Sequence, residues 1–153
     1  MNRRTILTFS AIAALGLTLV PGSVIAQQGT LRAQLVGTWA IVSDLTPAVA
    51  QQVGSNPKGY VMMDSGGRYV QVLRNSDRPK SAGRAEGVIA QFGTWSVNEA
   101  DKTLTLHREG ALNASLEGTD QKISVSLTGD DLKLTATNLA NGARIDIVYR
   151  RAK

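Results

Sequence analysis

The chain has 153 residues, which is enough for one domain with a single modest hydrophobic core. It contains no cysteine, which excludes disulfide bonds and thiolate metal sites. Its net charge of +5 is mild and its basic residues are scattered rather than arranged in a stripe, so we expect no nucleic-acid partner.

The N-terminal segment has the pattern of an export signal. Arg3 and Arg4 precede an apolar run over residues 6–20, Pro21 ends the run, and small residues lead to Ala26. We expect cleavage after Ala26 and a periplasmic or secreted protein. The two arginines also fit the twin-arginine pattern, but the export route stays open.

The mature part is therefore expected to be a single domain over residues 27–153, with a net charge of +3. An uncleaved membrane anchor is the alternative interpretation of the apolar run. That run is shorter than the roughly 20 apolar residues that a spanning helix needs, so we expect no membrane span in the mature form.

Two short helices are predicted early in the mature part. Thr30 suits an N-cap before Leu31 and Leu35, which lie one helical turn apart. Within the connection 44–58, a helix begins after Thr46 with Pro47 and ends at Gly54. We expect this second helix to lie over one end of a barrel.

Short extended runs joined by turn residues occupy most of the remaining chain, and the later ones alternate apolar and polar residues. The predicted strands are 37–43, 59–64, 68–74, 92–97, 102–110, 122–127, 132–137 and 143–151. Residues 85–90 fit either a helical turn or the start of a strand. The pattern predicts an all-β, eight-stranded antiparallel up-and-down barrel, with a flattened sandwich as the alternative. A barrel of this size either fills with side chains or encloses one small ligand.

Several short motifs then carry a family resemblance over nearly all of the mature chain. They are residues 35–39 (LVGTW), 56–60 (NPKGY), Gly66 with Gly67, residues 93–95 (GTW), and the run from Glu109 to Gln121 that includes Gly110, Asn113, Gly118, Thr119 and Asp120. With these motifs the chain resembles the bacterial and fungal lipocalin-like domain family. The resemblance implies a barrel with a central pocket that binds a ligand.

The resemblance also implies a structural contact at the closed end of the barrel. Lipocalins commonly stack an arginine of the last strand on the signature tryptophan, which is Trp39 here, and either Arg150 or Arg151 is placed to do so. The chain departs from the family pattern where many members have paired histidines, since Leu106 precedes His107.

Candidate pocket residues come from apolar and aromatic positions on the predicted strands. They are Tyr60, Met62, Tyr69, Trp95, Leu104 and Leu106, and residues of opposite parity cannot all face inward. Arg108 shares the parity of the two leucines. If that parity faces the interior, Arg108 reaches the barrel rim and meets an anionic head group. Which parity faces inward stays open.

His107 is the chain's only histidine and shares its parity with Glu109. If the leucines face inward, His107 points to solvent. In the opposite arrangement His107 and Glu109 act as base and orienting group inside a polar pocket, as in an isomerase or lyase. A lone histidine without cysteines or a carboxylate cluster predicts no metal site, and we expect no cofactor.

Taken together, these patterns predict an exported monomer that binds a small hydrophobic or amphiphilic ligand in its barrel. Two alternatives stay open. One is a barrel enzyme that uses His107 and Glu109, and the other is an exported protein-interaction module that binds through the connections 44–58 or 75–84.

Overall fold

The structure is a computed structural model that describes residues 29–81, 86–137 and 142–153, without the side chains of residues 43–45. The predicted export signal and its cleavage site lie outside the described residues. Part of the predicted 75–84 loop and of the last turn lies outside them as well.

Among the helices in the described part of the chain, none has the length and apolar character needed to cross a membrane.

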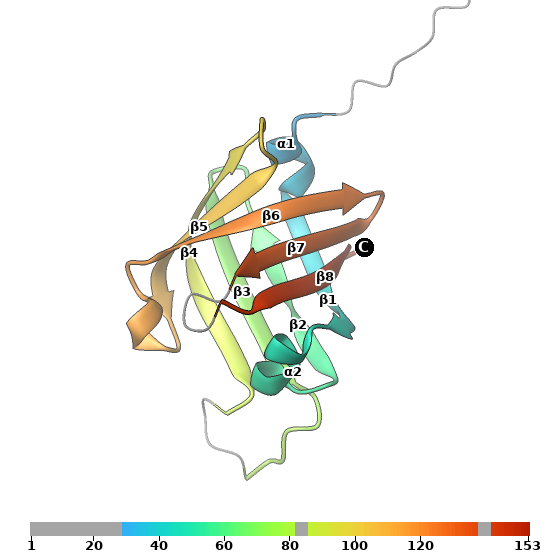
Figure 1. The fold of residues 1–153 in the computed structure, drawn as a ribbon, viewed down its shortest axis with the longest axis vertical. Helices are drawn as coiled ribbons and strands as arrows, with labels where there is room; N and C mark the ends of the chain where they lie inside the picture. Colours follow the sequence, from blue (N-terminus) through green and yellow to red (C-terminus); the bar gives the residue numbers. More distant parts are fainter. Residues whose placement is uncertain (1–28, 82–85, 138–141) are drawn as a thin grey trace, which may run out of the picture.

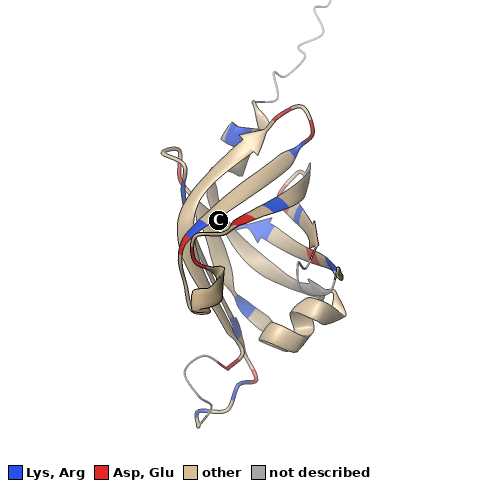
Figure 2. Cartoon of the chain, turned by 60° about the vertical axis from the view of Figure 1, so that its left-hand side comes forward, with Lys and Arg blue, Asp and Glu red and all other residues tan. Residues whose placement is uncertain are grey.

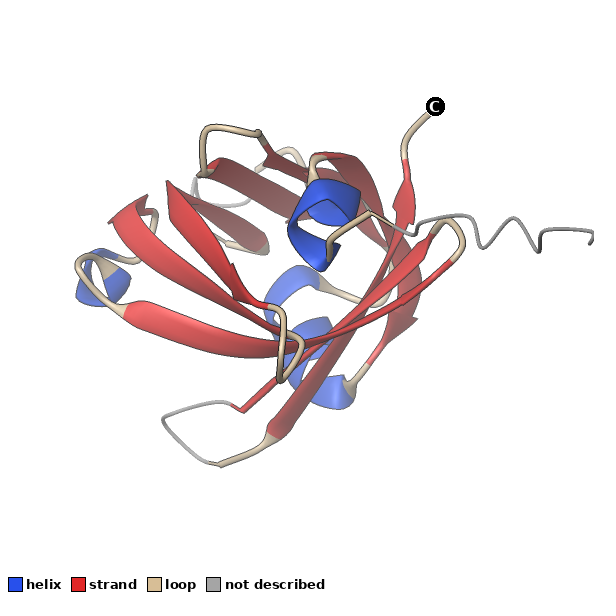
Figure 3. Ribbon diagram, turned by 90° about the horizontal axis from the view of Figure 1, so that it is seen from above, coloured by secondary structure: helices blue, strands red, loops and turns tan. Residues whose placement is uncertain are grey.

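Eight strands form one closed antiparallel barrel, in which each strand pairs with the next and the last pairs with the first (Figures 1 and 3). The strands are β1 (Gly37–Leu45), β2 (Pro57–Met63), β3 (Arg68–Asn75), β4 (Val88–Asn98), β5 (Thr103–Ala111), β6 (Asp120–Thr128), β7 (Asp131–Thr137) and β8 (Arg144–Arg151). The predicted up-and-down barrel is confirmed, and the sandwich alternative is wrong because β8 closes onto β1. Closure leaves no unpaired sheet edge.

Helix α1 (Leu31–Leu35) covers one end of the barrel (Figure 1). As predicted, the Thr30 hydroxyl caps it and accepts a hydrogen bond from the Ala33 amide at 3.2 Å. The carbonyl of Leu35 accepts a hydrogen bond from the indole N–H of Trp39 at 2.9 Å, which ties the helix to a fully buried tryptophan.

Helix α2 (Pro47–Val53) lies at the opposite end of the barrel from α1 (Figure 1). Pro47 starts it, its side chains Val49 and Val53 are buried, and Gly54 ends it with φ of 73°, a left-handed conformation that favours glycine. The start and end of this helix are those that the sequence predicts.

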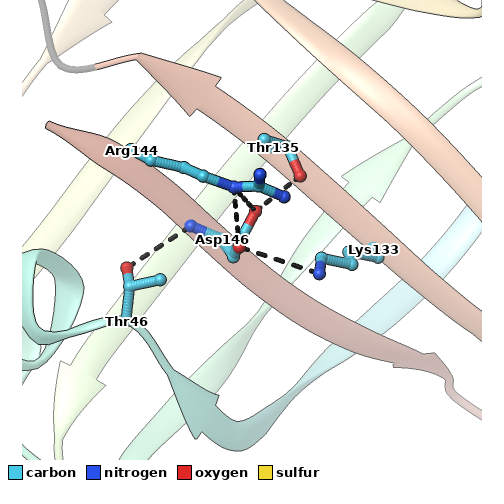
Figure 4. Close-up of polar contacts among 5 residues, drawn as sticks. All are labelled: Thr46, Lys133, Thr135, Arg144 and Asp146. Carbon is cyan, nitrogen blue, oxygen red and sulfur yellow. Dashed lines mark hydrogen bonds and ion pairs between the residues drawn. The ribbon is translucent and has the colours of Figure 1, made fainter. Parts of the chain in front are cut away.

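The residue before α2 is held by β8 (Figure 4). The hydroxyl of Thr46 accepts a hydrogen bond from the Asp146 amide at 3.3 Å instead of capping its own helix. The Asp146 carboxylate in turn accepts from the Thr135 hydroxyl at 2.6 Å and from Arg144 Nε at 3.0 Å. This cluster fixes the start of α2 to the outer face of β7 and β8.

The core follows the two-residue period of the strands, because alternate side chains point into the barrel. On β7, for example, Leu132, Leu134 and Ala136 are buried while Lys133 is exposed. Figure 2 shows basic residues interspersed with acidic ones over the barrel.

Candidate functional site

The barrel encloses a cavity of about 390 Å³. Its wall at the α2 end includes Gln52 of α2 and three residues of the β5–β6 connection, namely Leu112, Asn113 and Leu116. The last belongs to the short 3-10 helix η1 (Ala114–Leu116). All four residues are exposed to solvent, so the cavity reaches the surface between α2 and this connection.

Most of the cavity wall is apolar and, among the described residues, comes from six of the eight strands, all except β1 and β3. The apolar lining residues on the strands are Val61, Met63, Val88, Ile89, Ala90, Leu104, Leu106, Ala111, Ile123, Leu134, Ala136, Ile145 and Ile147. Such a wall with a few polar groups is the usual character of a small-molecule pocket.

The polar part of the wall is a continuous chain of hydrogen bonds across the interior. Gln71 of β3 donates to the Tyr149 hydroxyl at 2.7 Å, and Gln91 of β4 donates to Gln71 Oε1 at 2.7 Å. Arg108 of β5 then donates through Nε to Gln91 Oε1 at 2.8 Å. Four strands are thereby linked through side chains inside the barrel.

Arg108 is the cation of this site, and only 7% of its surface is exposed. Its Nη1 donates to the Thr119 hydroxyl at 3.0 Å, and Nη2 donates to Gln121 Oε1. Burial lowers the pKa of Arg108 from its ordinary value, although a guanidinium still carries its charge at neutral pH. Each hydrogen-bond acceptor that the described residues give its side chain is neutral.

The predicted pocket residues are divided between the interior and the outer face. Leu104, Leu106 and Arg108 line the cavity, so the leucine parity of β5 faces inward. The structure therefore places the Arg108 side chain inside the barrel, whereas the sequence predicts that it reaches the rim.

The two predicted aromatic wall residues on β3 and β4 are buried but do not line the cavity. Trp95 packs near the α1 end, where its indole N–H donates to the Asp64 carbonyl at 3.1 Å and the Arg32 guanidinium lies 4.5 Å from the ring centre. Tyr69 is 1% exposed, and its hydroxyl has no hydrogen-bond partner among the described residues.

Tyr60 and Met62 lie on the outer face of β2 and are 52% and 47% exposed. The strand pairings place them beside other exposed apolar side chains, since Tyr60 pairs with Val72 and Met62 pairs with Val70, which itself pairs with Phe92. We call these five residues the outer apolar strip.

His107 and Glu109 also lie on the outer face and do not pair with each other. His107 Nδ1 lies 2.6 Å from Asp120 Oδ1, and Glu109 forms an ion pair with Arg68 at 2.7 Å. Both residues are exposed and neither lines the cavity. The polar pocket required by the acid–base hypothesis is therefore not formed by these two side chains.

Trp39 and the last strand meet as the resemblance implies, and Arg151 is the arginine involved. Its guanidinium lies 4.1 Å from the centre of the Trp39 ring and donates to the carbonyls of Val36 and Gln34 at 3.1 and 2.6 Å. Arg150 instead faces outward and pairs with Asp131 at 2.7 Å.

Four polar residues that the strands contribute to the cavity wall are missing from the sequence-based candidates: Gln71, Gln91, Gln121 and Tyr149. A signal exists for the first. Arg68 and Arg74 share the parity of Val70 and Val72 on β3, which indicates that this parity faces water and that Gln71 faces inward. A pattern that assigns polar residues to the outside overlooks such positions.

Within the described residues, no group of three or more His, Cys, Asp or Glu side chains is placed to hold a metal ion.

Comparison with known proteins gives no matching family model and no matching curated protein.

Proposed function

We propose that the protein is an exported, lipocalin-like barrel that binds a small, largely apolar ligand in its cavity. The observation that carries this proposal is the cavity of about 390 Å³ with its predominantly apolar wall. Ligand pockets generally measure roughly 300–1,000 Å³ and combine apolar walls with a few oriented polar groups. An eight-stranded barrel has room for one such ligand.

The position of the cavity supports a carrier rather than a closed structural core. Exposed residues of α2 and of the β5–β6 connection form part of its wall, which gives a ligand a way in. At the other end, Trp39, Leu35 and Arg151 close the barrel. One end is thus sealed by packing, and the other is where a ligand enters.

Binding of a neutral fluorophore tests this function. We expect N-phenyl-1-naphthylamine, an uncharged apolar dye, to bind the protein with an increase in fluorescence. Ala136→Trp should reduce this binding at least tenfold, because the larger side chain occupies the cavity.

The matched control is Ser126→Trp, which places the same ring on an exposed position of β6. Retained binding in this variant together with loss in Ala136→Trp supports the cavity site. Binding that is equal in both variants would show that the dye sits elsewhere and would remove the carrier function.

A second candidate function, self-association, is favoured by the outer apolar strip. Contiguous exposed apolar side chains bounded by polar residues commonly mark contact surfaces. Lys58, Tyr60 and Met62 lie along the outer face of β2, and the exposed Asp64 follows the end of the strand. This order is self-complementary when two copies stack with antiparallel β2 strands. Lys58 would then meet Asp64 of the other copy, as a two-fold contact requires.

Sedimentation equilibrium distinguishes this second candidate from the monomer expected from the sequence. Self-association is supported if the original protein is a dimer and the Val70→Lys protein is a monomer. Ser126→Lys is the control, which changes an exposed residue of β6 outside the strip and should leave the dimer intact. A monomer at concentrations of about 100 μM, far above the Kd of a specific dimer, removes it.

A further inference from the structure

We propose that the cavity selects ligands with an anionic head group, a carboxylate in particular, which Arg108 binds while the apolar chain lies among Leu104, Leu106 and their neighbours. This inference rests on the proposed carrier function and names the chemical class of its ligand.

The first argument is the missing counter-charge. The described residues contribute no carboxylate within ion-pair distance of Arg108, although they supply partners for the surface arginines Arg68, Arg144 and Arg150. A buried charge is strongly unfavourable unless it is paired. The nearest acidic residue in the sequence, Glu109, points outward and is engaged by Arg68 at 2.7 Å.

The second argument is unused donor capacity. A guanidinium has five N–H donors, and the Arg108 side chain makes three hydrogen bonds to described residues, all to neutral side-chain oxygens. Two donors therefore have no acceptor among the described residues. The three neutral partners hold the planar group in place, so that binding requires little rearrangement.

The third argument is the hydroxyl of Tyr69, a second buried donor without an acceptor among the described residues. Tyr69 pairs with Gly93, which pairs in turn with Arg108, so the two side chains flank a position that has no side chain of its own. Burial raises the pKa of Tyr69 and the charge of Arg108 acts against that rise. Tyr69 does not line the cavity, so its unpaired hydroxyl indicates a local shortage of acceptors in the barrel wall near Arg108 rather than a ligand contact.

The order of residues along β5 gives the orientation of the ligand. Leu104 and Leu106 precede Arg108, and Ala111 and Leu112 follow it toward the β5–β6 connection, with all five lining the cavity. The apolar chain of a ligand therefore extends from Arg108 toward Leu104, and the head group stays nearer the exposed end. A single-chain amphiphile fits this arrangement.

Competition between matched ligands tests the inference on protein expressed from the full-length sequence. Dodecanoate, dodecanol and dodecylammonium, which share one chain length, compete with the neutral dye. We expect dodecanoate to bind about tenfold to a hundredfold more tightly than dodecanol, as charge-assisted hydrogen bonds imply. Dodecylammonium should bind most weakly, because its charge repels Arg108. Dodecanol that binds as tightly as dodecanoate would overturn the inference.

Three variants locate the selectivity. Arg108→Gln should abolish the preference for dodecanoate while the dye still binds, and Arg108→Lys should retain part of the preference because it keeps the charge. Arg74→Gln removes one exposed positive charge on β3 and should leave the preference unchanged. A preference that survives Arg108→Gln refutes the assigned head-group site.

The outcomes separate this inference from the function on which it rests. If the dye and dodecanol bind but dodecanoate has no advantage, the carrier function holds and the head-group inference fails. If neither the dye nor any of the three amphiphiles binds, both fail. The comparison of ligands on the original protein needs no variant, so a variant that does not fold leaves this test intact.

Discussion

Arg151 stacks its guanidinium on the ring of Trp39 at 4.1 Å and thereby joins the last strand of the barrel to the first. The same side chain donates to the carbonyls of Val36 and Gln34. The contact therefore also satisfies carbonyls of α1 and the residue that follows it. It lies at the end of the barrel opposite α2, and we interpret it as structural.

Arg151→Met should lower the free energy of unfolding by about 1 to 2 kcal/mol, because it removes a cation–π contact and hydrogen bonds to carbonyl groups. Urea denaturation followed by tryptophan fluorescence measures this. Arg150→Met is the matched control, since Arg150 pairs on the exposed outer face with Asp131, and it should have the smaller effect. Equal losses in the two variants would contradict the structural role of Arg151.

The Tyr149 hydroxyl is expected to stabilise the barrel through the interior hydrogen-bond chain. It is fully buried, its burial raises its pKa, and it accepts from Gln71 at 2.7 Å. Tyr149→Phe leaves that amide without an acceptor and should reduce the free energy of unfolding by about 1 kcal/mol. Tyr60→Phe removes a hydroxyl from an exposed ring and should change it by less than about 0.5 kcal/mol. A Tyr149→Phe protein as stable as the original would show that this hydrogen bond adds nothing to the free energy of unfolding.

The cluster around Asp146 makes a pH-dependent contribution to stability (Figure 4). The hydrogen bond from Thr135 is the main cause that lowers the pKa of Asp146, with Arg144 and Lys133 adding to it. A carboxyl with a lowered pKa in the folded state stabilises the protein above its unfolded pKa of about 3.9. This stabilisation is lost as the pH falls through the lower folded value.

Asp146→Asn should therefore destabilise the protein at pH 7 by about 1 kcal/mol, the order found for partly exposed charge pairs. The difference from the original protein should shrink as the pH falls below about 4. Urea denaturation at several pH values measures both. Asp77→Asn, which changes an exposed carboxyl of a loop, is the control. A stability difference between Asp146→Asn and the original protein that stays constant down to pH 2 would contradict the stabilising role of the ionised Asp146 carboxylate.

His107 should not affect ligand binding. It lies on the outer face beside Asp120, and Leu106 and Arg108 on either side of it in the sequence face the cavity. His107→Gln should leave the affinity for the neutral dye within about twofold of the original, because substitutions away from a site have small effects. A tenfold loss would require the cavity to include this side chain and would reopen the acid–base hypothesis.

The sequence predicts the barrel well because most strands bury one face and expose the other. On β6 and β7 the alternation of Ile123 with Ser124 and of Leu134 with Lys133 identifies both the strand and its inward side. The same rule is ambiguous on β2, where Tyr60, Val61, Met62 and Met63 are all apolar. The outward position of Tyr60 and Met62 follows from strand pairing and barrel closure, which a local pattern does not contain.

The polar side of the cavity is harder to predict for a related reason. Gln71 and Gln91 face inward by strand parity, and their hydrogen bonds join residues that are far apart in the sequence. The Gln71 partner Tyr149 lies on β8, which is not a neighbour of β3 in the barrel. Arg108 is placed on the correct parity by its spacing from Leu104 and Leu106. That its neighbours inside the barrel are neutral becomes visible only once β4, β5 and β6 lie side by side.

Native mass spectrometry of the protein purified from the cells that naturally produce it tests the central claim most directly. The account predicts a bound small molecule that is released on denaturation, with a single apolar chain and an acidic head group. Arg108→Gln protein purified in the same way should carry less of it, whereas Arg74→Gln protein should carry the usual amount. Protein that is consistently free of small molecules and fails to bind the neutral dye would contradict the carrier function.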